Sequence, residues 1–271
     1  KDGFNALMLA AKRGHAHIVY AIIQESTPKL LSKILSAKDQ YGNNALMLAA
    51  YKGHIETVKA ILNNCAPELL STILSATNQN GDNALMYAAS AGKNDIFNAI
   101  LEKSPSKLLL SATDEDGYNA LMYAARYGKN DIVSAILKSK NCTSKILSAT
   151  DEDGDNALIL AARHGHTDNV KAILESKHCS EDIPSATDNI GYNALMYAAK
   201  RGHTDTVEAI IASKHCTPDA ISAFLAKEEL CTTENLSNIL IAAASAGNTD
   251  IVKAIIASKH CSYEILSATN M

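Results

Sequence analysis

Histidine and cysteine lie side by side in three Lys-His-Cys tripeptides, at residues 177–179, 214–216 and 259–261. Such pairs could bind zinc or activate a thiolate nucleophile. Zinc requires four convergent ligands, and a catalytic pair requires one unique arrangement with a third group that orients the base. Here one motif recurs at regular intervals, and the sequence contains no Cys-x-x-Cys. We therefore predict no catalytic residue, no metal site and no cofactor.

The cysteines share this regular spacing. Cys142, Cys179, Cys216 and Cys261 each lie 23 residues after an asparagine that opens a recurring phrase. Equivalent residues of stacked repeats lie about 8–10 Å apart, whereas the Cα atoms of a disulfide lie within about 7 Å. We therefore expect reduced, partly buried thiols that act as small apolar residues, and a cytoplasmic location, where thiols stay reduced.

The recurring phrase reads Asn-Ala-Leu-Met-Tyr-Ala-Ala in its commonest form. It begins at Asn5, Asn44, Asn83, Asn119, Asn156 and Asn193, and in a diverged form at Asn238, with spacings of 39, 39, 36, 37, 37 and 45 residues. Such a period predicts a solenoid in which each repeat packs only on its neighbours. We predict one all-α array over residues 1–271, with approximate repeats at 1–37, 38–76, 77–112, 113–149, 150–186, 187–231 and 232–271, and an insertion at 217–237.

Composition argues against several classes of partner. The chain is 47% hydrophobic but has no run of about 18 apolar residues that could cross a membrane. Its net charge of −4 disfavours nucleic acid as a partner. The chain begins at Lys1, inside a turn, and residues 269–271 stop where another turn would open. We therefore expect a fragment of a longer protein, in which a missing targeting signal carries no information.

Each repeat carries the signals of two helices. In the fourth repeat, Gly117 supplies the positive φ of a turn, and Asn119 then caps a short inner helix over residues 120–126. Leu121 lies on the apolar face of this helix, together with two alanines that permit close packing. Gly128 ends the inner helix, and an outer helix with its own apolar stripe follows.

A third helix is predicted after the outer helix. A small residue followed by proline is a helix-start signal, and it occurs at Thr27-Pro28, Ala66-Pro67, Ser104-Pro105 and Thr217-Pro218. We expect a helix of one to two turns behind the outer helix in most repeats. The signal is weaker in the fourth and fifth repeats, and Pro184 should truncate the helix in the fifth.

These features together resemble the ankyrin repeat over the whole chain: a glycine turn, a capped helix of the form cap-x-Leu-x-x-Ala-Ala, two variable residues, Gly-His and an apolar outer helix. The phrase Asn-Ala-Leu-Met stands where the family usually has Thr-Pro-Leu-His. Methionine thus replaces a hydrogen-bonding histidine at Met47, Met86, Met122 and Met196, so polar bracing between neighbouring turns should be reduced. The Gly-His histidine is present at His15, His54, His166 and His203 and is replaced by Lys93, Lys129 and Asn248 elsewhere.

The resemblance implies that a partner binds the concave face, formed by the turn tips and by the two residues after each Ala-Ala pair. Carried onto this sequence, the predicted partner-binding residues are Lys12, Arg13, Tyr51, Lys52, Arg126, Tyr127, Arg163, His164, Lys200 and Arg201. Tyr118 and Tyr192, each directly after a turn glycine, are predicted to be aromatic anchors, because aromatic residues are enriched at binding hot spots.

The charges of this face suggest the chemistry of the partner. The helix ends are basic and aromatic, whereas the turn tips of the fourth and fifth repeats are acidic, at residues 114–116 and 151–153. A peptide with a carboxylate or phosphate that arginine can bind through two hydrogen bonds would suit the basic furrow. The alternative is that these residues are simply solvated helix ends.

The last junction breaks the period. Residues 220–230 read as an amphipathic helix, and the turn glycine is missing before Asn238. This segment is either a diverged terminal repeat that caps the array or a specific docking element.

As the resemblance implies, we expect a monomeric, non-catalytic protein-recognition module, of the kind found in scaffolds, regulators and effectors that intracellular bacteria send into the host cytosol. The alternative is a substrate-recruiting or autoinhibitory region of an enzyme whose catalytic domain lies outside residues 1–271.

Overall fold

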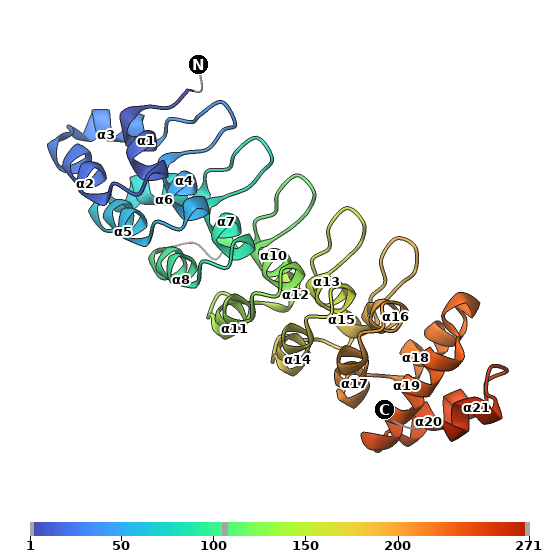
Figure 1. Ribbon diagram of the computed structural model, residues 1–271. Coiled ribbons are helices and arrows are strands. Elements are labelled where there is room, and N and C mark those ends of the chain that lie inside the picture. The colour runs from blue at the N-terminus through green and yellow to red at the C-terminus, as the bar shows by residue number, and fades with distance from the viewer. Residues whose placement is uncertain (1–2, 105–107, 269–271) are drawn as a thin grey trace. The chain divides into compact units, whose positions relative to one another are not determined.

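The computed structural model describes residues 3–104 and 108–268. Within these ranges the chain is all-α, with 21 α-helices, one 3-10 helix and no strand. The α-helices follow one another in seven sets of three, which we call the inner, outer and third helix of each set (Figure 1).

The inner helices are α1 (Ala6–Lys12), α4 (Ala45–Lys52), α7 (Ala84–Ser90), α10 (Ala120–Arg126), α13 (Ala157–Arg163), α16 (Ala194–Lys200) and α19 (Thr233–Ser245). The outer helices are α2 (Ala16–Glu25), α5 (Ile55–Asn64), α8 (Asn94–Lys103), α11 (Asn130–Lys138), α14 (Thr167–Glu175), α17 (Thr204–Ala212) and α20 (Thr249–Ile256). The third helices are α3 (Pro28–Leu35), α6 (Pro67–Ser75), α9 (Leu108–Ser111), α12 (Ser144–Ser148), α15 (Asp182–Ser185), α18 (Pro218–Leu225) and α21 (Tyr263–Ser267).

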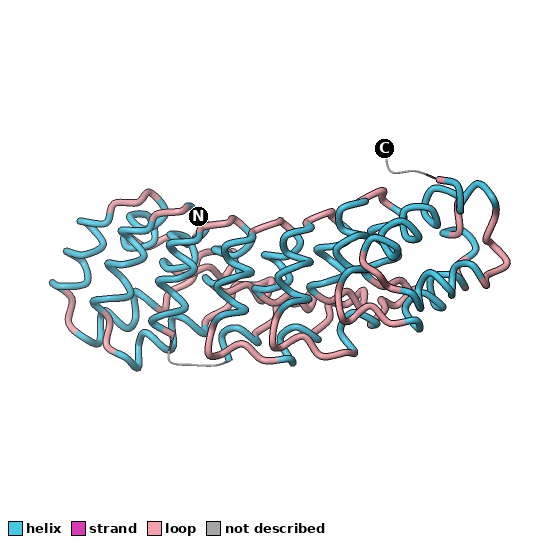
Figure 2. Tube along the Cα trace, turned by 90° about the horizontal axis from the view of Figure 1, so that it is seen from below, coloured by secondary structure: helices cyan, strands magenta, loops and turns pink. Residues whose placement is uncertain are grey.

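The chain forms two compact units, residues 1–124 and residues 125–271, which we call unit 1 and unit 2. In unit 1, α1 packs on α4 and α4 on α7, while α2 packs on α5 and α5 on α8. In unit 2, α13 packs on α16, and the outer helices α11, α14 and α17 stack in order. Figure 2 shows that helices and loops alternate along each unit. Each of these inner and outer helices therefore packs on its counterpart in the next set, whereas α17 packs on α19 at the end of unit 2.

The core of each unit consists of the apolar faces that the sequence predicts. Leu46, Ala49 and Ala50 of α4 are buried, as are Val58 and Ile61 of α5. Small alanines on the inner helix allow the neighbouring inner helix to approach closely, while the larger aliphatic residues fill the space toward the outer helix.

A third helix occurs in all seven sets, including the fourth and fifth, where the sequence signal is weak. Pro28 and Pro67 open α3 and α6, as expected for proline in the first helical turn. The helix α15, which contains Pro184, is only four residues long, so the predicted truncation is confirmed. Ser104 lies at the end of α8, and the predicted start at Pro105 lies outside the described residues.

The seventh set differs from the sequence-based expectation. The helix predicted over 220–230 stops at Leu225, and a 3-10 helix, η1 (Glu228–Leu230), follows after a break. The inner helix α19 begins at Thr233 and is capped by Thr232, whose side chain accepts the backbone N–H of Asn235. Asn238 therefore lies inside a helix instead of capping one.

Candidate functional site

Loops between the sets project past the inner helices in each unit (Figure 1). The loop that precedes α4 is organised by Asp39, which accepts the backbone N–H groups of Tyr41 at 2.9 Å and Asn43 at 2.8 Å. Neighbouring loops of unit 1 are joined by backbone hydrogen bonds, from Gln79 to Tyr41 (3.0 Å) and from Glu115 to Asn80 (2.9 Å). The loop tips are thus a connected surface rather than separate mobile turns.

Glycine is required where two loops meet. Gly81 has a φ of +82°, and a Cβ at this position would lie 2.7 Å from the Cα of Asp114 in the next loop. A side chain here would meet both left-handed strain and a backbone clash.

The inner helix ends are braced by the Gly-His histidine of the following set. His54 Nε2 lies 3.2 Å from the carbonyl oxygen of Lys12 in unit 1, and the same contact joins His166 to Arg126 (3.0 Å) and His203 to Arg163 (3.3 Å) in unit 2. This contact holds the last turn of each of these inner helices, which carries the predicted binding residues.

In unit 1, aromatic and cationic side chains gather at these helix ends. Tyr51 is 53% exposed, and its ring contacts Tyr87 edge-on at a centroid distance of 5.4 Å. The ammonium of Lys52 lies 5.0 Å from the Tyr51 ring centroid, and that of Lys12 lies 4.3 Å from the Phe4 centroid. Arg13 is exposed beside Lys12.

A tyrosine network that the sequence reading missed lies behind this surface. Asn78 Nδ2 donates to the Tyr87 hydroxyl at 2.7 Å, and that hydroxyl donates to Asn43 Oδ1 at 3.1 Å. The hydroxyl of Tyr123 donates to Asp114 Oδ2 at 2.6 Å. Burial, this hydrogen bond and the nearby charge of Asp82 raise the pKa of Tyr123. The sequence does contain a signal for this network, because the polar loop residue and the tyrosine are nine residues apart in both pairs. That spacing brings the two side chains together only once the loop has folded back over the inner helix.

In unit 2, the structure changes the role of Arg163. Its guanidinium pairs with the fully buried Asp155 at 2.5 Å, approaches Asp188 at 3.4 Å and lies 4.0 Å from the Tyr197 ring centroid. The Tyr197 hydroxyl in turn donates to Asp188 at 2.5 Å. The charge of Arg163, which we predicted to bind a partner, is therefore already paired within the fold.

The buried environment of Asp155 disfavours its ionised form. Desolvation and the nearby carboxylates of Asp151 and Asp188 raise the pKa of Asp155 to about 6, against the lowering effect of Arg163. The pair with Asp155 lies within the fifth set, and the contact of Arg163 with Asp188 links this set to the sixth.

Tyr192, which we predicted to be an aromatic anchor, is largely buried. It is only 5% exposed, and its hydroxyl donates to Glu229 at 2.8 Å. The ammonium groups of Lys200 and Lys227 lie over its ring, 4.6 and 5.1 Å from the centroid. Tyr118, in unit 1, is half-buried against the Tyr123 ring at 5.2 Å.

The remaining predicted residues of unit 2 lie at the surface. His164, Lys200 and Arg201 are exposed, Arg126 is half-buried, and Tyr127 is 47% exposed with the Arg126 guanidinium 5.9 Å from its ring centroid. Partial burial, and then the neighbouring charges of Arg126 and Arg201, lower the pKa of His164. His164 therefore favours its neutral form at neutral pH.

Only part of each acidic loop tip faces solvent. Glu115 and Asp116 in unit 1, and Glu152 and Asp153 in unit 2, are exposed. Asp114 and Asp151 are buried, because they accept backbone N–H groups of their own loops.

The cysteines are free thiols. Burial raises the pKa of Cys65, Cys142 and Cys179 to about 11 and that of Cys216 to about 12, so they are poor nucleophiles at neutral pH. Across residues 3–104 and 108–268, no group of three or more histidine, cysteine or acidic side chains could hold a metal ion. No helix in the same ranges is long and apolar enough to cross a membrane.

The insertion between the sixth and seventh sets meets the last loop through side chains. Lys227 Nζ donates to the carbonyl oxygen of Ile190 at 3.1 Å, and Glu229 receives the Tyr192 hydroxyl. Glu228 forms an exposed ion pair with Lys259. In place of a loop, η1 and its flanking residues cover this end of the turn surface.

The comparisons with known proteins fit this geometry. Residues 1–71, 60–146 and 140–222 each match the sequence model of ankyrin repeats in three copies. The chain is an ankyrin-repeat protein. No curated protein sequence matches it.

Solved structures show the same fold. The crystal structure of EF0377, an ankyrin-repeat protein, is 26% identical, with a TM-score of 0.62 over 76% of this chain and 96% of that one. The ankyrin-repeat domain of Bcl-3, a member of the IκB family, is 21% identical, with a TM-score of 0.63 over 79% and 88%. A chain of the complex between the Bdellovibrio bacteriovorus endopeptidase Bd0816 and its immunity protein Bd3460 is 23% identical, with a TM-score of 0.59 over 77% and 97%.

The fold explains why this ankyrin-repeat protein uses asparagine as the inner-helix cap. Asn44 accepts the N–H of Met47 at 2.9 Å, and its amide donates to the carbonyl oxygen of Ile73 in the third helix at 3.2 Å. Asn5 and Asn156 bind Ile34 and Ile183 in the same way. A threonine cap would leave that carbonyl without the amide, so asparagine couples the inner helix to the added third helix.

Methionine at the third helical position accepts a hydrogen bond that a polar side chain would otherwise accept. The sulfur of Met47 lies 3.4 Å from the backbone nitrogen of Asn44, and that of Met122 lies 3.4 Å from Asn119. The thioether accepts the N–H of the cap residue, as a glutamate or glutamine side chain does in a capping box.

Proposed function

We propose that this ankyrin-repeat protein is a monomeric, non-catalytic recognition module that binds a partner protein or peptide on the face formed by the inner helix ends and loop tips. The observation that carries the proposal is the exposed aromatic and cationic surface at these ends, represented by Tyr51 and Lys52 in unit 1 and by Tyr127 and Arg201 in unit 2. Tyrosine and arginine are the side chains enriched at binding hot spots.

The charge of this face favours an acidic or phosphorylated partner segment. Arg13 and Arg201 are exposed, and an exposed guanidinium can bind a carboxylate or phosphate through two hydrogen bonds. The raised pKa values of the buried thiols support a structural rather than a catalytic role for cysteine. Free cysteines also fit a reducing, cytoplasmic location.

The proposal is tested by affinity capture from a cell lysate with the natural chain, an Arg13→Glu/Arg201→Glu variant and a Lys138→Glu/Lys140→Glu control. The control makes the same change in charge at exposed positions of the α11 end. A protein retained by the natural chain and the control, but lost from the arginine variant, is the expected result. Equal retention by all three chains would place the binding surface elsewhere. Circular dichroism verifies that the variants fold.

A further inference from the structure

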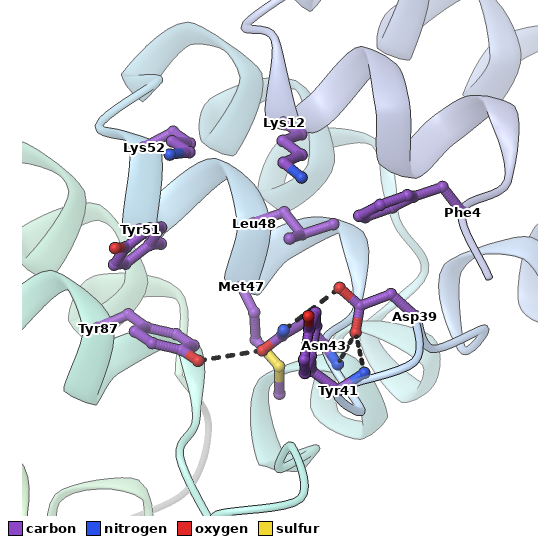
Figure 3. A pocket seen from close by; sticks show the side chains of 10 residues that line it. All are labelled: Phe4, Lys12, Asp39, Tyr41, Asn43, Met47, Leu48, Tyr51, Lys52 and Tyr87. Atoms are coloured by element: carbon purple, nitrogen blue, oxygen red, sulfur yellow. Dashed lines mark hydrogen bonds between the residues drawn. The ribbon is translucent and has the colours of Figure 1, made fainter. Parts of the chain in front are cut away.

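A pocket of about 210 Å³ opens in unit 1 between the first and second inner helices (Figure 3). Tyr51 and Tyr87 form one side, Phe4 forms the other, and Leu48 lies between them. The pocket therefore has apolar walls and is large enough for one side chain rather than a folded element.

Two lysines give this apolar pocket a positive rim. Lys12 and Lys52, at the ends of α1 and α4, both line the pocket, with Lys12 pointing toward Phe4 and Lys52 lying beside Tyr51 (Figure 3). No carboxylate in the described part of the chain forms an ion pair with either ammonium; the ammonium groups lie over the rings of Phe4 and Tyr51. Their charges are thus available to a ligand.

The acid in the pocket is already used by its own loop. One oxygen of Asp39 accepts the N–H groups of Tyr41 and Asn43, and the other lies 3.3 Å from Asn43 Nδ2. Asp39 is 7% exposed, and it lies on the side of the pocket away from the lysines (Figure 3). The two ends of the pocket consequently differ in charge.

We propose that this pocket binds a glutamate or aspartate side chain of a partner peptide. The carboxylate lies at the ammonium groups of Lys12 and Lys52, and the methylene groups lie on Leu48 between the aromatic rings. This inference rests on the proposed recognition function and names the chemistry of one of its subsites.

A carboxylate suits the pocket better than a phosphate. A phosphate carries nearly two negative charges, which would increase repulsion from Asp39. A glutamate or aspartate side chain has one negative charge for the two lysines and methylene groups that can pack on Leu48.

The test uses three capped peptides as probes: acetyl-Leu-Glu-Leu-amide, acetyl-Leu-Gln-Leu-amide and acetyl-Leu-phosphoserine-Leu-amide. Each is titrated into the ¹⁵N-labelled full chain at low salt, and amide chemical shifts are recorded. We expect saturable shifts at Phe4, Tyr51 and Lys52 with the glutamate peptide, and about threefold to tenfold weaker binding of the glutamine peptide. Equal binding of the glutamate and glutamine peptides would overturn the proposal, as would tighter binding of the phosphoserine peptide.

Matched variants separate the pocket from the overall charge of the chain. Lys12→Gln/Lys52→Gln should weaken binding of the glutamate peptide by about the same threefold to tenfold. Lys29→Gln/Lys33→Gln removes two charges from exposed positions of α3, outside the pocket, and should leave binding unchanged. Equal weakening by both variants would show a diffuse charge effect and would overturn the pocket assignment.

The outcome is distinguishable from a failure of the proposed function. If the Arg13→Glu/Arg201→Glu variant loses its captured partner but the glutamate peptide causes no shifts at the pocket, the recognition function is supported and the carboxylate subsite is wrong. If no partner depends on the arginines and the peptide does not bind, both proposals fail.

Discussion

Two junctions within unit 2 pack by different means. Between the fifth and sixth sets, the backbone N–H of Asn189 donates to Asp153 at 2.9 Å, and the His203 ring covers Gly165, where a Cβ would lie 2.7 Å from the ring nitrogen. Between the sixth and seventh sets, the Lys227 side chain reaches Ile190, and nothing lies within 4 Å of a Cβ on Gly202. The loops and the Gly-His histidine of the regular sets therefore make contacts between sets that the last junction replaces with other contacts.

The same contrast appears in the inner helices. The six helices that follow an intact phrase are capped by its asparagine, whereas α19 begins five residues before Asn238 and is capped by Thr232. The last set keeps three helices but replaces loop-to-loop bonding with side chains of the insertion. The sixth and seventh sets are thus joined by side chains of the insertion instead of by paired loops.

Core truncation should give the largest difference between regular and diverged sets. Leu121→Ala removes a fully buried side chain of the fourth inner helix and should lower the free energy of unfolding by about 2–5 kcal/mol. Leu240→Ala, at the equivalent phrase position of the seventh set, should cost about 2 kcal/mol or less, because this side chain is 9% exposed and its set lacks the loop-to-loop bonding of the regular sets. Urea unfolding of both variants tests this, and equal losses would contradict the contrast.

The glycines before the outer helices give a matched pair in one unit. Gly165 and Gly202 have φ values of +69° and +70°, so alanine at either position meets left-handed strain of about 1–2 kcal/mol. At Gly165 the new Cβ also meets the His203 ring, which should add about 1–3 kcal/mol. If thermal or urea unfolding gives the same loss for Gly165→Ala and Gly202→Ala, the histidine bracing does not contribute to stability.

The cap asparagine should matter only where it joins two helices. Asn44→Ser keeps a capping oxygen but removes the amide that binds Ile73, and should cost about 1–2 kcal/mol, the typical loss for a buried hydrogen bond. Asn238→Ser lies inside α19 and should change stability by less than about 0.5 kcal/mol. If Asn238→Ser lowers the free energy of unfolding as much as Asn44→Ser does, the loss comes from removing any asparagine amide and not from breaking the link to the third helix.

Sequence alone predicted the parts that depend on neighbours within one repeat. The inner helix expected over 120–126 is observed at those bounds, because cap, apolar spacing and glycine stop all lie within ten residues. The pairing of Arg163 and the burial of Tyr192 were not predicted, since their environments come from Asp188 and Glu229, which lie 25 and 37 residues further along the chain. Reading one repeat at a time cannot show which charge the next loop presents.

The smallest expected effect is a pH dependence that has opposite signs at the two junctions. The folded-state pKa of Asp155 is raised to about 6, above the unfolded value of about 3.9. Between these values the folded chain binds more protons than the unfolded chain, so its stability rises as pH falls through the window. At the last junction, the hydrogen bond from Tyr192 lowers the pKa of Glu229, so its contribution is lost as pH falls.

These signs can be separated by measuring urea unfolding at pH 7 and pH 5. Asp155→Asn keeps an oxygen for Arg163 but cannot titrate, and should reduce the gain in stability on acidification by about 1–2 kcal/mol relative to the natural chain. Glu229→Gln, at an exposed position, should not reduce that gain. If Asp155→Asn leaves the pH dependence of stability unchanged, the attraction of Arg163 outweighs the effect of burial on the pKa of Asp155. The carboxylates at the two junctions would then not differ in the direction of their pKa shifts, although the junctions pack differently.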